Sequence, residues 1–331
     1  MKFAIVGAGA IGAYVGACLA AGGEEVALVA RGPHLEAMQK QGVRVRLETG
    51  QTLTAHPYAT DNPAEIGAVD VVFLTVKAQS LRAVSPSLAP LLGPETPVVA
   101  GQNGVPWWFF ENWGGPLKDT HLKAVDPDGF LSATIPAQRV IGCVVYCSAV
   151  MVAPGVIEQT EGNRFAIGEL HGARSERCRR IAHAFQKGGL KCVVRSRIRH
   201  DVWVKLIGNM AFNPISALTR ANLEEILRDP DASALARAIM EEGHAVAHAL
   251  GLELDISVDQ RFNGAARVGP HKTSSLQDIE MGRSLETEAI AGAVVELADR
   301  LGVRIPQTKA VYTCARLLER QNLRHSDSRN S

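Results

Sequence analysis

Charge imbalance and paired cysteines are both missing from this sequence of 331 residues. Its 35 Lys and Arg residues balance 34 Asp and Glu residues, and no long run of like charge occurs. The chain therefore lacks the bulk charge that binds nucleic acid or a membrane surface, so we expect neither and look for a small-molecule partner. The sequence has no Cys-x-x-Cys pair, and this pattern favours reduced thiols in a cytoplasmic protein over disulfides or a zinc site. The six cysteines are Cys18, Cys143, Cys147, Cys178, Cys192 and Cys314.

We expect the amino-terminal apolar stretch to belong to the fold and not to a secretory signal. Residues 3–23 are nearly all apolar or small and follow an early Lys, as in a leader, but glycines interrupt them repeatedly. Residues 3–12 read FAIVGAGAIG, a short strand that runs into a Gly-x-Gly-x-x-Gly turn and then into an Ala-rich helix. This order predicts a dinucleotide-binding βα unit.

The glycine spacing suits a pyrophosphate. The first glycine permits the tight turn, the second lets the backbone approach the phosphates, and the third lets helix and strand pack closely. The helix start adds N–H groups and a positive dipole. A tightly packed turn without a ligand is the alternative. The candidate cofactor-binding residues here are Gly7, Ala8, Gly9, Ala10, Ile11 and Gly12.

Three further residues fall where strands of such a sheet end. The second strand, 25–30, is followed by Arg31, where an NAD site usually offers an acidic residue, so we predict NADPH with Arg31 on its 2′-phosphate. Lys77 and Asn103 follow the apolar strands 69–77 and 96–100, and ligands of open α/β sheets bind at these ends. The alternatives are a solvated Arg31 and a plain Asn-Gly turn at Asn103.

The overall pattern predicts two domains. Strands alternate with helices, including those expected at 33–41 and after Ser80, as far as about residue 195, which indicates an α/β, Rossmann-type doubly wound sheet. Residues 43–54 alternate apolar and polar around a turn at 48–51, which predicts a β-hairpin. Long helical periodicities follow, which indicate an all-α domain with helices at 201–213, about 222–228, 231–250, 274–281, 285–301 and 306–320. We place the NADP-binding domain at 1–197, the helical substrate and catalytic domain at 198–322, and a disordered tail at 323–331. The Trp-rich segment 105–139 is either a pocket wall or an interface with a second subunit, so a homodimer is one expectation.

One polar stripe singles out residues 201–214 of the second domain. Lys205, Asn209 and Asn213 recur every four residues and therefore share one face of a helix. Apolar residues cover much of the remaining surface, so the stripe has to face something polar, such as a cleft. The alternative is a core helix whose Lys205 extends to solvent.

Taken together, these motifs resemble the ketopantoate reductase (2-dehydropantoate 2-reductase) family over nearly the whole chain. The matching motifs are GAGAIG, TVKAQ, QNG, W-x-K-L-x-x-N-x-x-x-N-P, and T-S-S-L-Q-D-I-E followed by G-R-x-x-E. The resemblance implies NADPH-dependent reduction of 2-dehydropantoate to pantoate, in pantothenate and coenzyme A biosynthesis. By the same resemblance, Lys205 is the general acid and Glu286 its partner carboxylate. It also implies that Asn103 and Asn209 line the reacting centre and that Asn213 and Ser274 hold the substrate.

Hydride transfer to a ketone leaves an alkoxide that needs a proton donor, and a Lys in a partly desolvated cleft suits that role. The sequence departs from the family pattern after Glu286, where Glu288 replaces an Asp and Ala291 an Asn. These departures leave room for a bulkier 2-oxo acid, and a non-catalytic NADP(H) sensor is a further alternative. His244 and His248 lie one helical turn apart, but without a third ligand we expect no metal.

Overall fold

The computed structural model describes residues 1–115 and 117–330, and the chain forms two compact units. Unit 1 consists of Met1–Gln102 and Gly129–Arg199, and unit 2 of Asn103–Asp128 and the residues from His200 onward. The continuous first domain predicted over 1–197 is therefore wrong for 103–128. The reason is packing between aromatic rings, since Phe109 of this segment lies against Trp203 of unit 2 with ring centroids 5.8 Å apart.

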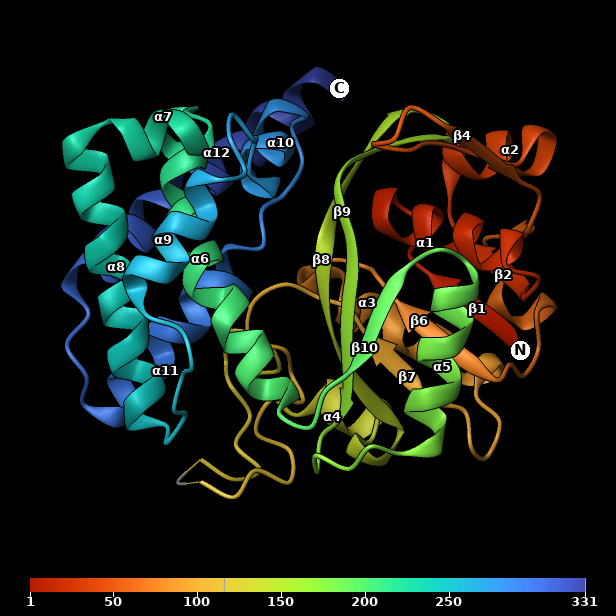
Figure 1. Ribbon diagram of the computed structural model, residues 1–331, viewed down its shortest axis with the longest axis horizontal. Coiled ribbons are helices and arrows are strands. Elements are labelled where there is room, and N and C mark those ends of the chain that lie inside the picture. Colours follow the sequence, from red (N-terminus) through yellow and green to blue (C-terminus); the bar gives the residue numbers. More distant parts are fainter. Residues whose placement is uncertain (116, 331) are drawn as a thin grey trace. The chain divides into compact units, whose positions relative to one another are not determined.

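Unit 1 is built on one sheet of ten strands. Its order is β4-β3-β9-β8-β7-β6-β1-β2-β5, with β10 beside β9 (Figure 1). β1 pairs in parallel with β2 and β6, and β7 with β6 and β8, which confirms the predicted doubly wound arrangement. The strands are β1 (Lys2–Val6), β2 (Glu25–Val29), β3 (Val43–Arg46), β4 (Thr52–Ala55), β5 (Tyr58–Thr60), β6 (Val71–Leu74), β7 (Val98–Ala100), β8 (Val140–Ala153), β9 (Val156–Glu169) and β10 (Lys191–Val194).

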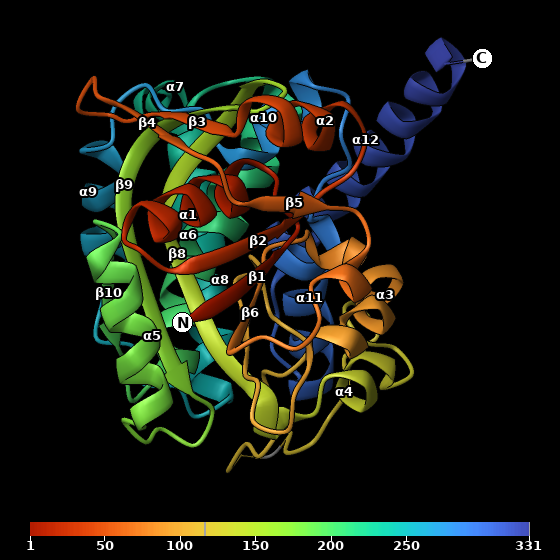
Figure 2. The ribbon, with the colours of Figure 1, turned by 90° about the vertical axis from the view of Figure 1, so that its right-hand side faces the viewer.

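Two antiparallel hairpins complete the sheet. β3 and β4 pair across the turn predicted at 48–51, and the long strands β8 and β9 pair across Ala153-Pro154-Gly155. The central strands are continuous apolar runs because helices cover them. Helices α1 (Ala10–Ala21) and α5 (Glu176–Lys187) lie side by side on one face of the sheet (Figure 2).

The remaining helices of unit 1 are short. α2 (Gly32–Gln41) follows β2, as predicted, and α4 (Phe130–Thr134) precedes β8. The helix expected after Ser80 is only one turn long, α3 (Leu81–Val84), and continues as a 3-10 segment, Ser85–Leu91. Pro90 lies inside that segment and has no N–H to donate, so a regular α-helix does not form there.

Among the described residues of unit 2, the regular elements are all helices, as predicted, and the part 103–128 adds turns and irregular backbone. The helices of unit 2 include α9, which the sequence analysis did not predict, although Ser257 and Gln260 form a capping box at its start. A π-helix, Glu288–Gly292, interrupts the segment predicted as one helix over 285–301. The helices are α6 (Ile198–Thr219), α7 (Leu223–Arg228), α8 (Pro230–Ala249), α9 (Val258–Ala266), α10 (Ser274–Glu280), α11 (Ala293–Leu301) and α12 (Pro306–Asn330).

The predicted disordered tail is also corrected, because α12 continues as far as Asn330. No proline or glycine follows Pro306, so nothing in the sequence breaks the helical hydrogen bonding. Ser331 lies outside the described residues.

Helix α6 is buried along most of its length. Trp203, Leu206, Ile207 and Met210 on it are at most 1% exposed. The indole N–H of Trp203 donates to the Gly243 carbonyl of α8 at 3.1 Å. A side chain at Gly243 would also collide with Met210, since its Cβ would lie 2.9 Å from the sulfur. This close packing holds one face of α6 rigidly and leaves its polar stripe in a fixed orientation.

Candidate functional site

The glycine-rich turn of unit 1 is held by hydrogen bonds to neighbouring strands. Gly7 has a φ of +95°, which favours glycine, and its N–H and that of Ala8 donate to the Val29 carbonyl at 3.2 and 3.0 Å. The Thr75 hydroxyl, just beyond β6, donates to the Gly7 carbonyl at 2.8 Å. Thr75 was not among the predicted site residues, although it lies inside the TVKAQ motif.

The start of α1 offers donors to an anion. The first bond into the helix runs from the Ala13 N–H to the Gly9 carbonyl at 2.8 Å, and no side chain caps the helix at Gly9. The N–H groups of Ala10, Ile11 and Gly12 precede that bond and have no intrahelical acceptor. Such a helix start binds phosphate groups well.

The space around the turn also fits a pyrophosphate. A Cβ built at Gly9 would meet only the Gly7 carbonyl, at 4.0 Å, so the backbone is open there for a close approach. A Cβ at Gly12 would instead lie 2.4 Å from the same oxygen, so only glycine fits at that contact. These are the roles predicted for the second and third glycines of the motif, and the residues present can hold a dinucleotide.

Arg31 and Lys77 lie beyond the same ends of the strands. Val6 of β1 is paired with Val29 of β2 and with Leu74 of β6, so the three strands end level with one another. Arg31 is exposed at the start of α2, and among the described residues its side chain has no hydrogen bond or ion pair. Lys77 is half-buried at the start of a 3-10 turn. Both cations are therefore placed at the edge where a dinucleotide would bind.

In unit 2, three of the predicted site residues form one hydrogen-bonded chain. The Lys205 ammonium donates to Asn103 Oδ1 at 2.6 Å, and Asn103 Nδ2 donates to Glu286 Oε2 at 3.2 Å. All three side chains are half-buried. An ammonium, an amide and a carboxylate are thus fixed together although they come from distant parts of the sequence.

A π-helix fastens the turn that carries Asn103. The Val105 N–H donates to the Ala289 carbonyl at 2.8 Å, and Ala289 belongs to the π-helix that begins two residues after Glu286. Gly104 has a φ of +83°, and a Cβ there would lie 2.3 Å from the same carbonyl oxygen. π-helical insertions are frequent at functional sites. The contact keeps Asn103 and Glu286 together, and the sequence pattern did not reveal it.

A second hydrogen-bonded pair lies toward the C-terminal end of the polar stripe on α6. Asn213, 6% exposed, donates through Nδ2 to the hydroxyl of Ser274 at 3.2 Å, and Ser274 is the first residue of α10. Between the two groups, Asn209 is half-buried, and its side chain has no hydrogen bond to another described residue. Its amide is therefore available to a ligand.

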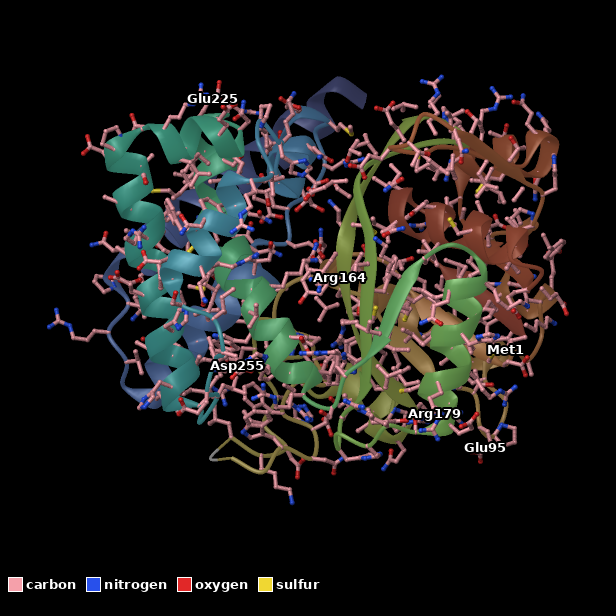
Figure 3. The ribbon with its side chains drawn as sticks, viewed as in Figure 1. Met1, Glu95, Arg164, Arg179, Glu225 and Asp255 are labelled. Atoms are coloured by element: carbon pink, nitrogen blue, oxygen red, sulfur yellow. The ribbon has the colours of Figure 1, made fainter. Side chains whose placement is uncertain are left out.

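Asn222 serves the structure and not the site. Its side chain accepts from the Glu225 N–H at 3.0 Å, and the Glu225 carboxylate accepts from the Asn222 N–H at 2.7 Å. Figure 3 labels Glu225 at the start of α7. This capping box occupies both side chains and gives neither a place at the site.

The aromatic segment after Asn103 is interior. Trp107, Trp108, Phe109 and Phe110 are at most 3% exposed, and Phe109 packs on Trp203 of α6. Buried rings cannot contact another chain, so the subunit-interface interpretation is wrong for these four side chains. They support the helix that carries Lys205.

Metal-binding clusters, membrane-spanning helices and disulfides are absent from the part of the chain that the structure describes. No group of three or more His, Cys, Asp or Glu side chains there is arranged to hold a metal ion. None of the helices in this part of the chain has the length and apolarity needed to cross a membrane. The six cysteines form no disulfide in it.

Comparison with known proteins connects both units to one family. Residues 3–172 match the family model of the ketopantoate reductase PanE/ApbA, and residues 197–319 match the model of its C-terminal part. A 2-dehydropantoate 2-reductase of Mesorhizobium japonicum is 48% identical over 319 residues, 96% of this chain and 98% of that protein.

Solved structures agree with this fold. A ketopantoate reductase homologue from Ralstonia solanacearum MolK2 superimposes with a TM-score of 0.91 at 41% identity, covering 97% of this chain and 98% of that one. A D-mandelate dehydrogenase, solved with NADH and anilino(oxo)acetate, has a TM-score of 0.83 at 21% identity and covers 97% and 99%. At that identity the likeness concerns the fold alone.

Proposed function

Because the chain belongs to the ketopantoate reductase PanE/ApbA family, we propose that it reduces 2-dehydropantoate to pantoate with NADPH. The single observation that carries the proposal is the pair of hydrogen bonds that links Lys205 through Asn103 to Glu286. These hydrogen bonds support a role for Lys205 as a proton donor held within the helical unit. The reaction would contribute to pantothenate and coenzyme A biosynthesis.

Lys205 supplies the proton in this proposal. A bound nicotinamide would supply the hydride, and the ketone oxygen that becomes an alkoxide then requires a proton within hydrogen-bond reach. The Lys205 ammonium is one such donor, and its bond to the Asn103 oxygen restricts where the other two N–H groups point. Because Lys205 is half-buried, solvent can return the proton after each turnover.

Glu286 acts through the amide of Asn103. Its carboxylate accepts from Asn103 Nδ2, which turns the amide oxygen towards Lys205. An amide that faces a carboxylate on one side and an ammonium on the other has only one favourable orientation. Glu286 therefore fixes the position of the acid, and it remains an acceptor for a substrate hydroxyl.

Neutral donors would hold the rest of the substrate. Asn209 offers a side-chain amide without another described partner, and Asn213 and Ser274 form a donor pair one helical turn further along α6. Amide and hydroxyl groups bind a carboxylate without adding charge next to the ammonium of Lys205. This arrangement suits a small 2-oxo acid.

The choice of NADPH rests on unit 1. Pyridine nucleotides serve this family, and the open start of α1 suits their pyrophosphate. Arg31 is exposed beyond β2 in place of the acidic residue typical of NAD sites, and a guanidinium binds phosphate well. Arg31 would bind the 2′-phosphate, with Lys77 nearby at the same edge.

The departures from the family pattern have a structural explanation that favours ketopantoate over a bulkier acid. Glu288 accepts from the Tyr312 hydroxyl at 2.7 Å and pairs with Arg316 at 3.0 Å, so its carboxylate anchors the π-helix to α12. Ala291 is 1% exposed and belongs to the core. The bonds of Glu288 thus go to α12 and not to Lys205, Asn103 or Glu286.

The test measures NADPH oxidation through its absorbance, with ketopantoate, 2-oxoisovalerate and larger 2-oxo acids offered as substrates in parallel. We expect ketopantoate to give the highest kcat/KM. Turnover of a bulkier acid alone would keep the reductase chemistry and reject the substrate. No turnover of any acid despite tight NADPH binding would favour a non-catalytic sensor. A cytoplasmic location and a homodimer stay predictions.

A further inference from the structure

His34 is bound through both of its ring nitrogens, within unit 1. Nε2 lies 2.8 Å from the Ala8 carbonyl oxygen, and the Gly155 N–H donates to Nδ1 at 2.9 Å. A carbonyl only accepts and a backbone N–H only donates, so the ring carries its proton on Nε2 and is neutral. Burial lowers the pKa of His34, which agrees with a neutral ring.

The two partners of His34 belong to turns that are far apart in the sequence. Ala8 lies in the glycine-rich turn, and Gly155 lies at the tip of the β8–β9 hairpin, 121 positions after His34. The tip is itself held, because the Gly155 carbonyl accepts from the Arg44 N–H at 2.9 Å. His34 therefore ties the glycine-rich turn to a rigid part of the sheet.

The bond to Ala8 controls one particular peptide. The Ala8–Gly9 peptide donates its N–H to the Gly7 carbonyl at 2.7 Å, and its carbonyl accepts from His34. Because a peptide is planar, holding both groups fixes its orientation. Without His34, rotation of this peptide could turn the carbonyl towards the helix start, where its partial negative charge would repel a phosphate.

We propose that His34 is a positioning residue for dinucleotide binding, which keeps the Ala8–Gly9 peptide in the orientation that accepts a pyrophosphate. The inference rests on the proposed use of a pyridine dinucleotide. Thr75 and Val29 hold the other groups of the turn, so His34 completes the set of contacts that leave the N–H groups at the start of α1 free for the ligand.

The experiment compares three substitutions of His34 in the full chain, with NADPH affinity measured by fluorescence titration. His34→Ala removes both bonds. In His34→Gln the amide reaches the position of Nε2 and can donate to Ala8, whereas in His34→Asn the shorter amide reaches only the position of Nδ1. Replacement of an exposed histidine of α5, His183→Ala, is the matched control.

We expect His34→Ala to weaken NADPH binding about tenfold, as the loss of a hydrogen bond of ~1.4 kcal/mol would. His34→Gln should bind within about twofold of the parent, and His34→Asn should remain as weak as His34→Ala. Equal affinity of the Gln and Asn variants, or parental affinity of a folded His34→Ala, overturns the inference. If the Ala variant fails to fold, the NADPH affinities of the Gln and Asn variants decide whether His34 has this role.

Nitrogen NMR of the imidazole gives an independent reading, because the two ring nitrogens differ when only one is protonated. Protonated Nε2 beside unprotonated Nδ1 supports the role, and the opposite tautomer overturns it. The titrations use no 2-oxo acid, so failure of ketopantoate turnover leaves the inference intact. A parent chain that binds neither NADPH nor NADH would overturn both the proposed cofactor and this role.

Discussion

Asn103 and Lys205 lie 102 positions apart in the sequence, yet the Lys205 ammonium donates a 2.6 Å hydrogen bond to the Asn103 amide oxygen. The other end of the same amide donates to Glu286 at 3.2 Å. An amide has both a donor and an acceptor, so Asn103 can join an ammonium to a carboxylate while remaining neutral. The position of the proposed acid therefore depends on a residue that does not ionise.

Replacing Asn103 should lower the rate more than it lowers NADPH binding. Asn103→Ala removes the group that orients Lys205, so we expect kcat to fall about 10²-fold through loss of positioning. Asn103→Asp keeps an acceptor for Lys205 but sets a second carboxylate against Glu286, so it should not restore the rate. Steady-state kinetics with ketopantoate and an NADPH titration measure both effects. Parental kcat in either variant would show that the amide does not position the acid.

Gly104 should tolerate no side chain. Gly104→Ala places a Cβ 2.3 Å from the Ala289 carbonyl in a backbone conformation with φ of +83°, so the turn carrying Asn103 has to shift. Gly302→Ala is the matched control, because its φ is +68° but nothing lies within 4 Å of the added Cβ. Gly302→Ala should lose about 1–2 kcal/mol of unfolding free energy for the strained backbone, and Gly104→Ala should lose more because of the clash. Only Gly104→Ala should also lower kcat, by more than about tenfold. Equal kcat in the two variants would contradict the proposed role of the turn.

The cysteines should differ sharply in reactivity. Burial raises the pKa of Cys18 to about 12, of Cys178 to about 11 and of Cys192 to about 12, whereas Cys314 is exposed on α12. Since the thiolate is the reactive form, these three thiols should stay inert near neutral pH in the native protein. A disulfide reagent should label Cys314 first, and Cys314→Ser should remove this fast phase. Fast labelling of Cys18 in native protein would argue against the packing of α1.

A buried ion pair should make stability depend on pH. Glu169 is 2% exposed, and burial alone would raise its pKa, but bonds from Arg177 at 2.6 and 2.7 Å and from Ser175 at 2.5 Å outweigh burial and lower it. A lowered folded-state pKa contributes stability above the unfolded pKa that is lost as pH falls through the folded value.

Glu169→Gln should therefore lower the free energy of unfolding by about 3 kcal/mol near neutral pH, since Arg177 loses its charged partner. It should also flatten the decline of that free energy as the pH falls into the acid range. Denaturant unfolding at several pH values measures both. A variant that keeps the parental slope in acid would show that another group causes the decline.

Local features of the site could be predicted from the sequence. The glycine-rich turn is encoded within six consecutive residues, and the Lys205, Asn209 and Asn213 stripe follows from helical periodicity. Both describe one element at a time. Resemblance to a family, and not spacing, singled out Glu286 and Ser274.

Contacts between distant elements could not be predicted. Helical periodicity does not show that a buried aromatic segment would place residues 103–128 in unit 2, or that the Ala289 carbonyl would accept from Val105. The two bonds of His34 likewise depend on where a hairpin tip lies. Such contacts depend on the packing of the whole unit, which no local pattern encodes.

If Lys205 donates the proton, kcat of Lys205→Ala and Lys205→Arg, measured with ketopantoate and saturating NADPH, should fall steeply. The Ala variant lacks a donor, and the Arg variant keeps the charge but has a pKa too high for it to act as an acid. We predict that both lose about 10²- to 10⁴-fold in kcat while the affinity for NADPH stays within about twofold of the parent. A loss smaller than about threefold in either variant would mean that the proton comes from another group.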